Sequence, residues 1–267
     1  MNGEKNKQSK FHYGVNYIGL QTFVSREIQR FLRTFVQSIL SPWISAVLYI
    51  LVFGLIIGKK IDLIGGVEYI DFVLPGIVML NLIGSAFSQS AFSLYFQRFA
   101  RHIEEVLIAP ISYLEMILGY VAGGVARGLV VGVGIYFISI FFGSASIVHF
   151  WLFVFYAIAV AVIFSLLGLL VGLWSDSFEQ LSILNTFIIT PLTFLGGVFN
   201  SIYMLPVKAQ MFVRFNPFFY FVDGLRYSMI GVSEANVWVG LIIIFSLIIV
   251  LGGVVWYLFK IGWRIRS

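Results

Sequence analysis

The chain has 267 residues, of which 60% are hydrophobic, 18% are aromatic and only 11% are charged. A soluble protein of this length would need far more polar surface, so the composition excludes a water-soluble core and indicates a polytopic membrane protein. The formal net charge of +5 is modest, and in a membrane protein its placement matters more than its sum, so we expect no nucleic-acid partner. Cysteine is absent, which excludes disulfides and thiolate metal sites.

Residues 1–35 are expected to form a cytoplasmic N-terminal segment that contains an amphipathic helix. Residues 1–10 are polar and carry lysines, and the first long apolar run begins only near Val36, too late for a cleavable signal. One helical face would hold Leu20, Phe23, Val24, Ile28, Phe31, Leu32 and Phe35, and the other Gln21, Ser25, Arg26, Gln29, Arg30 and Arg33. This pattern predicts an interfacial helix lying along the headgroups, and a cytosolic helix packed on a partner is the alternative.

Six apolar windows lie in the rest of the chain, each near or above the roughly 20 residues needed to cross the hydrocarbon. They are Val36–Ile57, Ile70–Phe96, Tyr113–Phe142, Val148–Trp174, Phe178–Phe199 and Val237–Phe259. The sequence therefore predicts an all-α membrane protein with six transmembrane helices, and an even number of spans puts both termini on one side.

The positive-inside rule assigns the side of the termini to the cytoplasm. The basic residues expected on that side are Lys5, Lys7, Lys10, Arg26, Arg30, Arg33, Arg98, Arg101, Lys260, Arg264 and Arg266. Those expected on the other side are fewer, namely Lys59, Lys60, Lys208, Arg214 and Arg226. We therefore predict a multi-pass protein with both ends in the cytoplasm.

The segment between the second and third spans, QRFARHIEEVLIAPIS, predicts a short amphipathic cytoplasmic helix over about 98–109. It combines Arg98, Arg101, Glu104 and Glu105 with apolar residues, and it stops at Pro110, whose ring disfavours helix before it. An ordinary solvated loop is the alternative. A partner-binding role is favoured because the rest of the chain resembles a transporter and contains no nucleotide-binding motif that could supply energy.

The third span is rich in glycine and carries a charge near its middle. Gly119, Gly123, Gly124, Gly128 and Gly132 in this span, with Gly168 and Gly172 in the fourth, have spacings that permit close helix approach. Close packing is the favoured interpretation, and a flexible gating helix is the alternative. Arg127 would cost at least about 2.5–3.5 kcal/mol in the bilayer centre, so it must face something polar. It either lines a cavity or gate, or pairs structurally through Asn81, Gln89 or Asn185.

Residues 191–231 break the apolar pattern before the last span. The run stops at Gly196 and Gly197, Pro206 stands where a first helical position would be, and Asn216 before Pro217 predicts an N-cap. Two helices of roughly ten residues would each reach about 15 Å, half the hydrocarbon thickness. We therefore predict a re-entrant helical hairpin over about 200–231, which enters from outside between the fifth and sixth spans.

The second arm of this hairpin is predicted to be amphipathic. Its apolar stripe would be formed by Phe218, Val222, Leu225 and Met229. Asp223 and Arg226 would project elsewhere.

Motifs for catalysis are not convincing in this chain. Gly54, Gly58 and Lys59 superficially suggest a nucleotide loop, but the glycine spacing is one residue short and Lys60 stands where Ser or Thr should. The three histidines, His12, His102 and His149, lie in different regions without a carboxylate cluster. We therefore expect no metal site, no catalytic residue and no enzymatic activity in this chain.

Three stretches carry a resemblance to a known family. They are FQRFARHIEEVLIAP before the third span, GYVAGGVARGL within it, and TPLTFLGGVFNSIYMLP with NPFFYFVDGLRYSMIG around the hairpin. The chain resembles the ABC-2 type transport permeases, and within them the YadH-like bacterial inner-membrane group, from the N-terminal helix to the C-terminus. Residues 36–267 would then form the ABC-2 type transmembrane domain.

The resemblance implies half of a homodimeric pore in the bacterial inner (plasma) membrane, in contact with lipid. A separate cytosolic ABC ATPase would bind ATP and magnesium, so this chain would hold no cofactor. Glu104 matches the acidic position of the family's coupling helix, flanked by Arg98 and Arg101, with Glu105 beside it. The hairpin signature is matched by Gly196, Gly197, Pro206, Asn216, Pro217, Gly224 and Arg226.

The resulting hypothesis is a permease subunit of an ATP-driven exporter of a drug, lipid or glycoconjugate, with the cargo itself unassigned. In this hypothesis the ATPase pushes on the 98–109 helix and opens a pathway bordered by Arg127 and the hairpin. The alternatives are an ATP-independent secondary transporter or channel, which predicts broken helices at matching places in two halves, and a non-transporting membrane scaffold.

Overall fold

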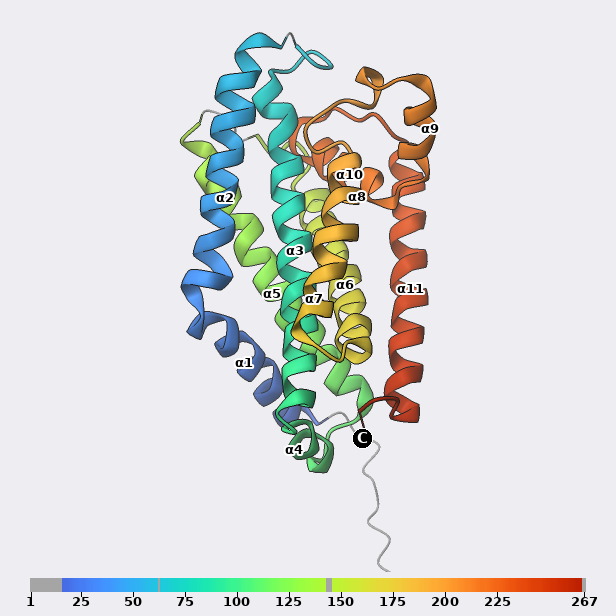
Figure 1. Cartoon of the computed structure of the whole chain (residues 1–267). Helices are drawn as coiled ribbons and strands as arrows, with labels where there is room; N and C mark the ends of the chain where they lie inside the picture. The colour runs from blue at the N-terminus through green and yellow to red at the C-terminus, as the bar shows by residue number, and fades with distance from the viewer. Residues whose placement is uncertain (1–15, 62, 143–145, 266–267) are drawn as a thin grey trace, which may run out of the picture.

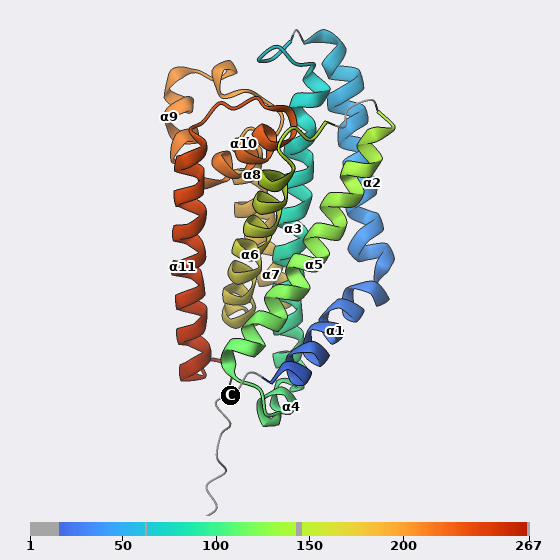
Figure 2. The same cartoon turned by 180° about the vertical axis from the view of Figure 1, so that it is seen from behind.

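A computed structural model describes residues 16–61, 63–142 and 146–265 (Figure 1). Its helices are α1 (Tyr17–Arg33), η1 (Val36–Leu40), α2 (Ser41–Tyr49), η2 (Ile50–Ile57), η3 (Gly58–Lys60), α3 (Tyr69–Phe99), α4 (Ile103–Ile108), α5 (Tyr113–Ile140), α6 (Phe150–Trp174), α7 (Phe178–Leu184), η4 (Asn185–Ile189), α8 (Thr190–Leu195), η5 (Ile202–Met204), α9 (Val207–Phe215), α10 (Pro217–Ile230) and α11 (Val237–Ile261). The long helices run side by side, α5 is inclined across the others, and α1 slants away from α2 at one end (Figures 1 and 2).

The described residues contain six helical stretches long and apolar enough to cross a membrane, as predicted. They are Val36–Lys60, Tyr69–Phe99, Tyr113–Ile140, Phe150–Trp174, Phe178–Leu195 and Val237–Ile261. The first stretch joins η1, α2, η2 and η3, and the fifth joins α7, η4 and α8. Segments η1, η2 and η4 are π-helical, a geometry that is rare and is often found at functional sites.

Glycines bring the central helices together, which agrees with the packing interpretation. A Cβ added to Gly124 of α5 would lie 3.0 Å from the Ala86 carbonyl oxygen of α3. A Cβ at Gly172 of α6 would lie 2.8 Å from the Ala91 carbonyl oxygen of α3. The backbone of α3 therefore packs closely against the backbones of both α5 and α6. Most side chains of α3 are buried.

Helix α1 packs more intimately on the bundle than an interfacial helix would require. Phe23 and Phe31 are buried as the amphipathic pattern predicted, but Leu32 and Phe35 are exposed. Glu27, which the pattern left unassigned, is completely buried. A Cβ at Gly123 of α5 would lie 2.8 Å from the Glu27 Cβ, so α1 lies directly on the glycine face of α5.

The two sets of basic residues separate to opposite ends of the molecule. Helices α1 and α4 and the end of α11 lie at one end, and α9 and the loop after η3 lie at the other (Figure 1). Lys5, Lys7, Lys10 and Arg266 lie outside the described residues. The described start and end of the chain share one end of the molecule, as an even number of spans requires.

The segment before α11 contains most of the helix-capping and helix-ending residues that the sequence predicted. Asn216 caps α10, with its Oδ1 accepting from the Phe218 N–H at 3.1 Å, and Pro217 occupies the first helical turn. Pro206 is the residue before α9 and not its first helical residue. Gly197 ends the α8 segment with a φ of +85°, a conformation that glycine adopts without strain.

The predicted apolar stripe of α10 is buried, with Phe218, Val222, Leu225 and Met229 all in the core. Asp223 and Arg226 project away from that stripe but are buried as well, which the sequence did not indicate. The two charges form an (i, i+3) pair inside the protein, and Arg226 also contacts the carbonyls of Phe72 and Gly197, distant residues that helical periodicity does not reveal.

Candidate functional site

A polar groove lies among the middles of the membrane-spanning helices. It has a volume of about 290 Å³. Its lining residues are Gln37, Ser41, Pro42, Ser45, Tyr49, Leu80, Asn81, Gly84, Ser85, Ser88, Arg127, Asn185 and Thr190. Helix α2 and the continuous α7–η4–α8 rod stand on either side of α3 (Figure 1), so residues of the first and fifth spans meet those of α3 and α5 here.

Arg127 reaches this groove from α5. Its Nε donates to the Ser38 carbonyl oxygen at 3.2 Å, within the π-helical segment η1. A π-helical turn displaces carbonyls from the regular α-helical ladder, which frees one to accept from a side chain. None of the ion pairs formed by described residues involves Arg127.

The three predicted partners of Arg127 have different positions. Asn81 and Asn185 line the same groove, with the Asn81 Nδ2 donating to the Ile77 carbonyl oxygen at 2.9 Å. Gln89 lies elsewhere, and its Nε2 donates to the Glu27 carbonyl oxygen at 3.4 Å. The geometry thus brings Arg127 to a cavity, while its role in gating stays a prediction.

A buried polar cluster at the joint of α1, α3 and α5 was not predicted from the sequence. The Glu27 carboxylate accepts from the Ser93 hydroxyl and from Gln97 Nε2, the latter at 3.1 Å, and lies 3.6 Å from the Arg30 guanidinium. The Gln97 Oε1 in turn accepts from the Tyr120 hydroxyl at 2.9 Å and from Arg26 at 3.1 Å. Burial raises the pKa of the Glu27 carboxyl, and Arg30 opposes that shift.

The only sequence signal for this cluster lies within α1. Glu27 is a lone acidic residue among Arg26, Arg30 and Arg33, at helical spacing from Arg30. An (i, i+3) pair of opposite charge on a helix indicates a polar contact. Its burial depends on Gly123 of α5 lying directly against it, a contact that the sequence does not show.

The predicted cytoplasmic helix exists in a shorter form. Helix α3 continues to Phe99, a turn follows, and α4 occupies Ile103–Ile108. Ile103 and Val106 are buried, whereas Arg101, Glu104 and Glu105 are exposed. Arg101 has a φ of +57°, so the chain turns sharply there, and α4 projects at the end of the bundle (Figure 1).

The Arg98 side chain donates hydrogen bonds to backbone carbonyls of this chain instead of extending freely into solvent. Its Nη1 donates to the carbonyl oxygens of Gly172 at 2.7 Å and Leu173 at 2.8 Å, and its Nε donates to that of Arg264 at 2.7 Å. These contacts satisfy carbonyls that would otherwise have no partner at the C-terminal end of α6, and they tie α11 to the end of α3.

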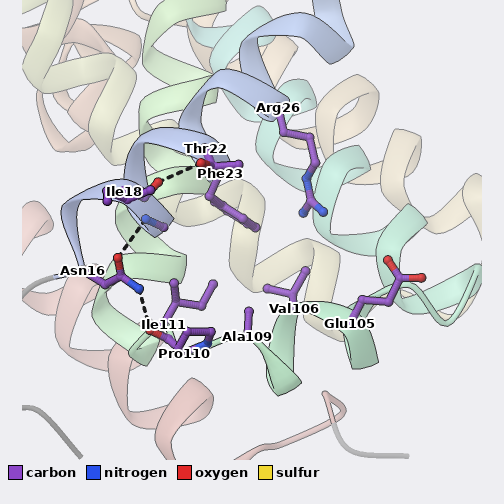
Figure 3. A pocket seen from close by; sticks show the side chains of 11 residues that line it. Asn16, Ile18, Thr22, Phe23, Arg26, Glu105, Val106, Ala109, Pro110 and Ile111 are labelled. Carbon is purple, nitrogen blue, oxygen red and sulfur yellow. Dashed lines mark hydrogen bonds between the residues drawn. The ribbon is translucent and has the colours of Figure 1, made fainter.

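An apolar pocket of about 440 Å³ separates α1 from α4 (Figure 3). Phe23, Val106 and Ile111 line it, and Arg26 and Glu105 lie at its edge. Asn16 fixes one side, because its Nδ2 donates to the Pro110 carbonyl oxygen at 3.1 Å while its Oδ1 caps α1. This hydrogen bond links the loop after α4 to the start of α1.

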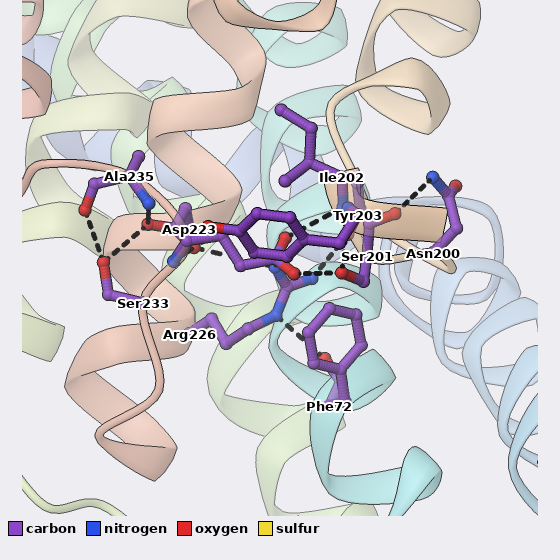
Figure 4. Close-up of polar contacts among 11 residues, drawn as sticks. Phe72, Asn200, Ser201, Ile202, Tyr203, Asp223, Arg226, Ser233 and Ala235 are labelled. Carbon is purple, nitrogen blue, oxygen red and sulfur yellow. Dashed lines mark hydrogen bonds and ion pairs between the residues drawn. The ribbon is translucent and has the colours of Figure 1, made fainter. Parts of the chain in front are cut away.

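At the opposite end of the molecule, Arg226 joins α10 to α3 and to the loop after α8 (Figure 4). Its Nε donates to the Phe72 carbonyl oxygen at 3.1 Å, its Nη2 donates to that of Gly197, and its guanidinium carbon lies 3.8 Å from the Phe72 ring centroid. Asp223 and Glu234 are 3.8 and 4.0 Å from its Nη1.

Both carboxylates of this cluster also hold backbone. Asp223 accepts from the N–H groups of Glu234 at 2.9 Å and Ala235 at 3.0 Å, and Glu234 accepts from the Ser201 hydroxyl and from the Ile202 N–H at 3.1 Å. The cluster is a structural lock on the hairpin region. Of the predicted signature, Gly224 has a separate role, because a Cβ there would collide with the Tyr156 ring.

Metal chemistry finds no support in the part of the chain that the structure describes, where no group of three His, Cys, Asp or Glu side chains could hold an ion.

Comparison with known proteins agrees with this arrangement. The family model described as ABC-2 type transporter matches residues 19–230. Inner membrane transport permease YadH of Escherichia coli (strain K12) is 39% identical over 254 residues, which cover 94% of this chain and 98% of that protein. Nodulation protein J of Rhizobium leguminosarum bv. viciae is 26% identical over 75% of this chain and 78% of its own length, and that of Rhizobium meliloti is 27% identical over 73% and 74%.

Proposed function

Because this chain belongs to the ABC-2 type transporter family, we propose that it is the membrane subunit of an exporter whose ATP is hydrolysed by a separate cytosolic subunit. The observation that carries this proposal is α4, a short helix with two apolar side chains buried in the bundle and two exposed glutamates in its first turn. Such a helix is suited to bind a partner and transmit its movement, because one face packs on the bundle and the other face is exposed.

The proposed stroke begins when two ATPase subunits close and press on α4. Asn16 links the end of the α4 segment to α1, so both elements move together. The permease halves then rock and open a pathway near their seam. Arg127 and the aromatic hairpin border that pathway, and both ends of the chain lie in the cytoplasm of a bacterium, with the re-entrant hairpin entering from outside.

A homodimer fits the uneven burial of the spans. Within one copy, 18% of the apolar window of the first span, 17% of that of the fifth and 11% of that of the sixth are buried, against 72% of that of the second. The first and fifth spans flank the polar groove. A second copy placed against this face would cover the exposed apolar surface and enclose the groove between the two halves.

Charge reversal at Glu104 tests the coupling role. Glu104→Arg is expected to abolish ATP-dependent transport and stimulated ATPase activity in reconstituted vesicles, with insertion unchanged. Glu68→Arg is the matched control, because Glu68 is also exposed but lies before α3 at the opposite end of the molecule. Normal ATP-dependent transport by the Glu104→Arg variant would refute the coupling role.

An ATP-independent transporter or channel is the alternative function. It would transport cargo in vesicles that contain no nucleotide-hydrolysing protein, whereas the proposal requires none to be moved there. Co-purification of this chain with an ATPase from its native membrane would favour the proposal.

A further inference from the structure

The polar groove around Arg127 carries an inference about the cargo, and this inference rests on the proposed transport function. We propose that the groove binds the anionic head group of an amphiphile, a lipid or lipid-linked molecule with a phosphate or carboxylate.

The charge balance of the groove favours an anion. Arg127 supplies a guanidinium, and none of the described residues that line the groove is acidic. The one hydrogen bond that Arg127 makes to described residues uses Nε and leaves both terminal nitrogens without a protein partner. A guanidinium presents these two donors in a fork that fits a phosphate or carboxylate.

Neutral donors surround this cation. The hydroxyls of Ser41, Ser45 and Ser88 line the groove and make no hydrogen bond to a described residue. Ser41 and Ser45 are exposed and Ser88 is half-buried, so these hydroxyls are free to donate to a head group that enters the groove. The Asn185 Oδ1, an acceptor, is buried without a partner among the described residues, which indicates a ligand that also carries a hydrogen-bond donor.

The position of the groove explains why the ligand should have a lipid tail. Arg127 lies midway along the Tyr113–Ile140 span, where a charge without a counter-charge is costly and marks a functional site. The helices that line the groove also carry exposed apolar side chains, including Ile44 and Leu48 on α2 and Phe187 on η4. A head group in the groove would neutralise Arg127 while its tail lies between the two proposed copies, against these apolar side chains.

Native mass spectrometry of the purified full chain in a neutral detergent tests the proposal. The probes are phosphatidic acid and phosphatidylcholine with identical acyl chains, added in equal amounts. We expect at least about tenfold preferential retention of phosphatidic acid, the effect of one or more charge-assisted hydrogen bonds. Equal retention of the two lipids would overturn the proposal.

Variants locate the preference. Arg127→Gln should abolish it and Arg127→Lys should keep part of it, whereas Arg33→Gln, which removes an exposed cation of α1 outside the groove, should leave it unchanged. If Arg127→Gln does not fold, Ser45→Leu fills the groove with the charge intact and should lower retention. Persistence of the preference in Arg127→Gln, or in a folded Ser45→Leu variant, would overturn the site.

Two further arms separate related explanations. Excess inorganic phosphate should not displace the bound lipid, and displacement would indicate a simple anion site and overturn the amphiphile assignment. The binding assay contains neither ATP nor ATPase, so Glu104→Arg should retain the lipid preference. Nucleotide-independent transport together with an intact preference would refute the proposed function and leave this site standing.

Discussion

Replacing Arg226 by Met tests whether the cluster at the end of α10 locks the hairpin region. The guanidinium is completely buried, and Met retains much of its length without charge. The variant loses hydrogen bonds to the Phe72 and Gly197 carbonyls, the contact with the Phe72 ring, and the cation between Asp223 and Glu234. Removing one partner of a buried ion pair typically costs about 3–5 kcal/mol, because the remaining charge is left uncompensated.

The assay is thermal unfolding of the detergent-solubilised protein, followed by the monodisperse fraction after heating. We expect Arg226→Met to lower the melting temperature by about 6–20 °C, since 1 kcal/mol corresponds to about 2–4 °C in a chain of this size. Asp176→Asn is the control, because it breaks the Arg264–Asp176 pair, whose N–O distance is 3.1 Å and whose side chains are 37% and 64% exposed. An exposed pair contributes about 0–1 kcal/mol, so this control should melt close to the unaltered protein.

A double-mutant cycle separates the charge from the packing. Asp223 holds the loop at Glu234 and Ala235 whether or not Arg226 is present, so Asp223→Asn alone is destabilising. If the ion pair matters, Asp223→Asn should cost less in the Arg226→Met background, with a coupling of about 0.5–3 kcal/mol. Equal costs in both backgrounds, or an Arg226→Met protein as stable as the control, would refute the reasoning.

Three smaller predictions concern packing, backbone and pH. Gly124→Ala should cost about 1–3 kcal/mol because its Cβ meets the α3 backbone, whereas Gly132→Ala, with its nearest contact at 3.4 Å, should be neutral or stabilising in the same melting assay. Arg101→Gly should raise the melting temperature slightly, since φ is +57° there. Burial raises the pKa of Glu27 above its ordinary 4.5, so its contribution to stability is lost as pH rises above that value. The advantage of Glu27→Gln over the unaltered protein should therefore grow with pH, and a pH-independent difference would contradict this.

Signals that are local in sequence predicted the architecture well. The six spans follow from the length and apolarity of each window, and the Asn216 cap with Pro217 follows from the chemistry of two adjacent residues. The glycine spacing likewise predicted close packing, because removing a side chain has the same steric effect whichever helix approaches.

Contacts between residues far apart in the chain could not be predicted from the sequence. The burial of Glu27 requires α5 to present Gly123, and the burial of Arg226 requires Phe72 and Glu234 to meet it from two other segments. Helical periodicity placed Asp223 and Arg226 off the apolar stripe of α10 but gave no sign that both are buried. Arg98 was predicted to flank a partner-binding helix, a role still untested, and its binding of α6 carbonyls depends on where α6 ends in space.

The described contacts form a continuous mechanical connection from α4 to the groove. Pro110, at the end of the α4 segment, is tied to Asn16 at the start of α1, and α1 lies against α5 where Glu27 meets Gly123. One turn further along α5, Arg127 holds the Ser38 carbonyl of the π-helical segment that follows α1. A displacement of α1 along α5 must therefore alter the Ser38–Arg127 contact, which lies in the wall of the groove. A π-helical turn can revert to α-helix with a small change in register, so η1 is the element in which such a displacement would be absorbed. In the proposed mechanism, coupling and cargo binding therefore meet at Arg127, a charge that is costly at this depth.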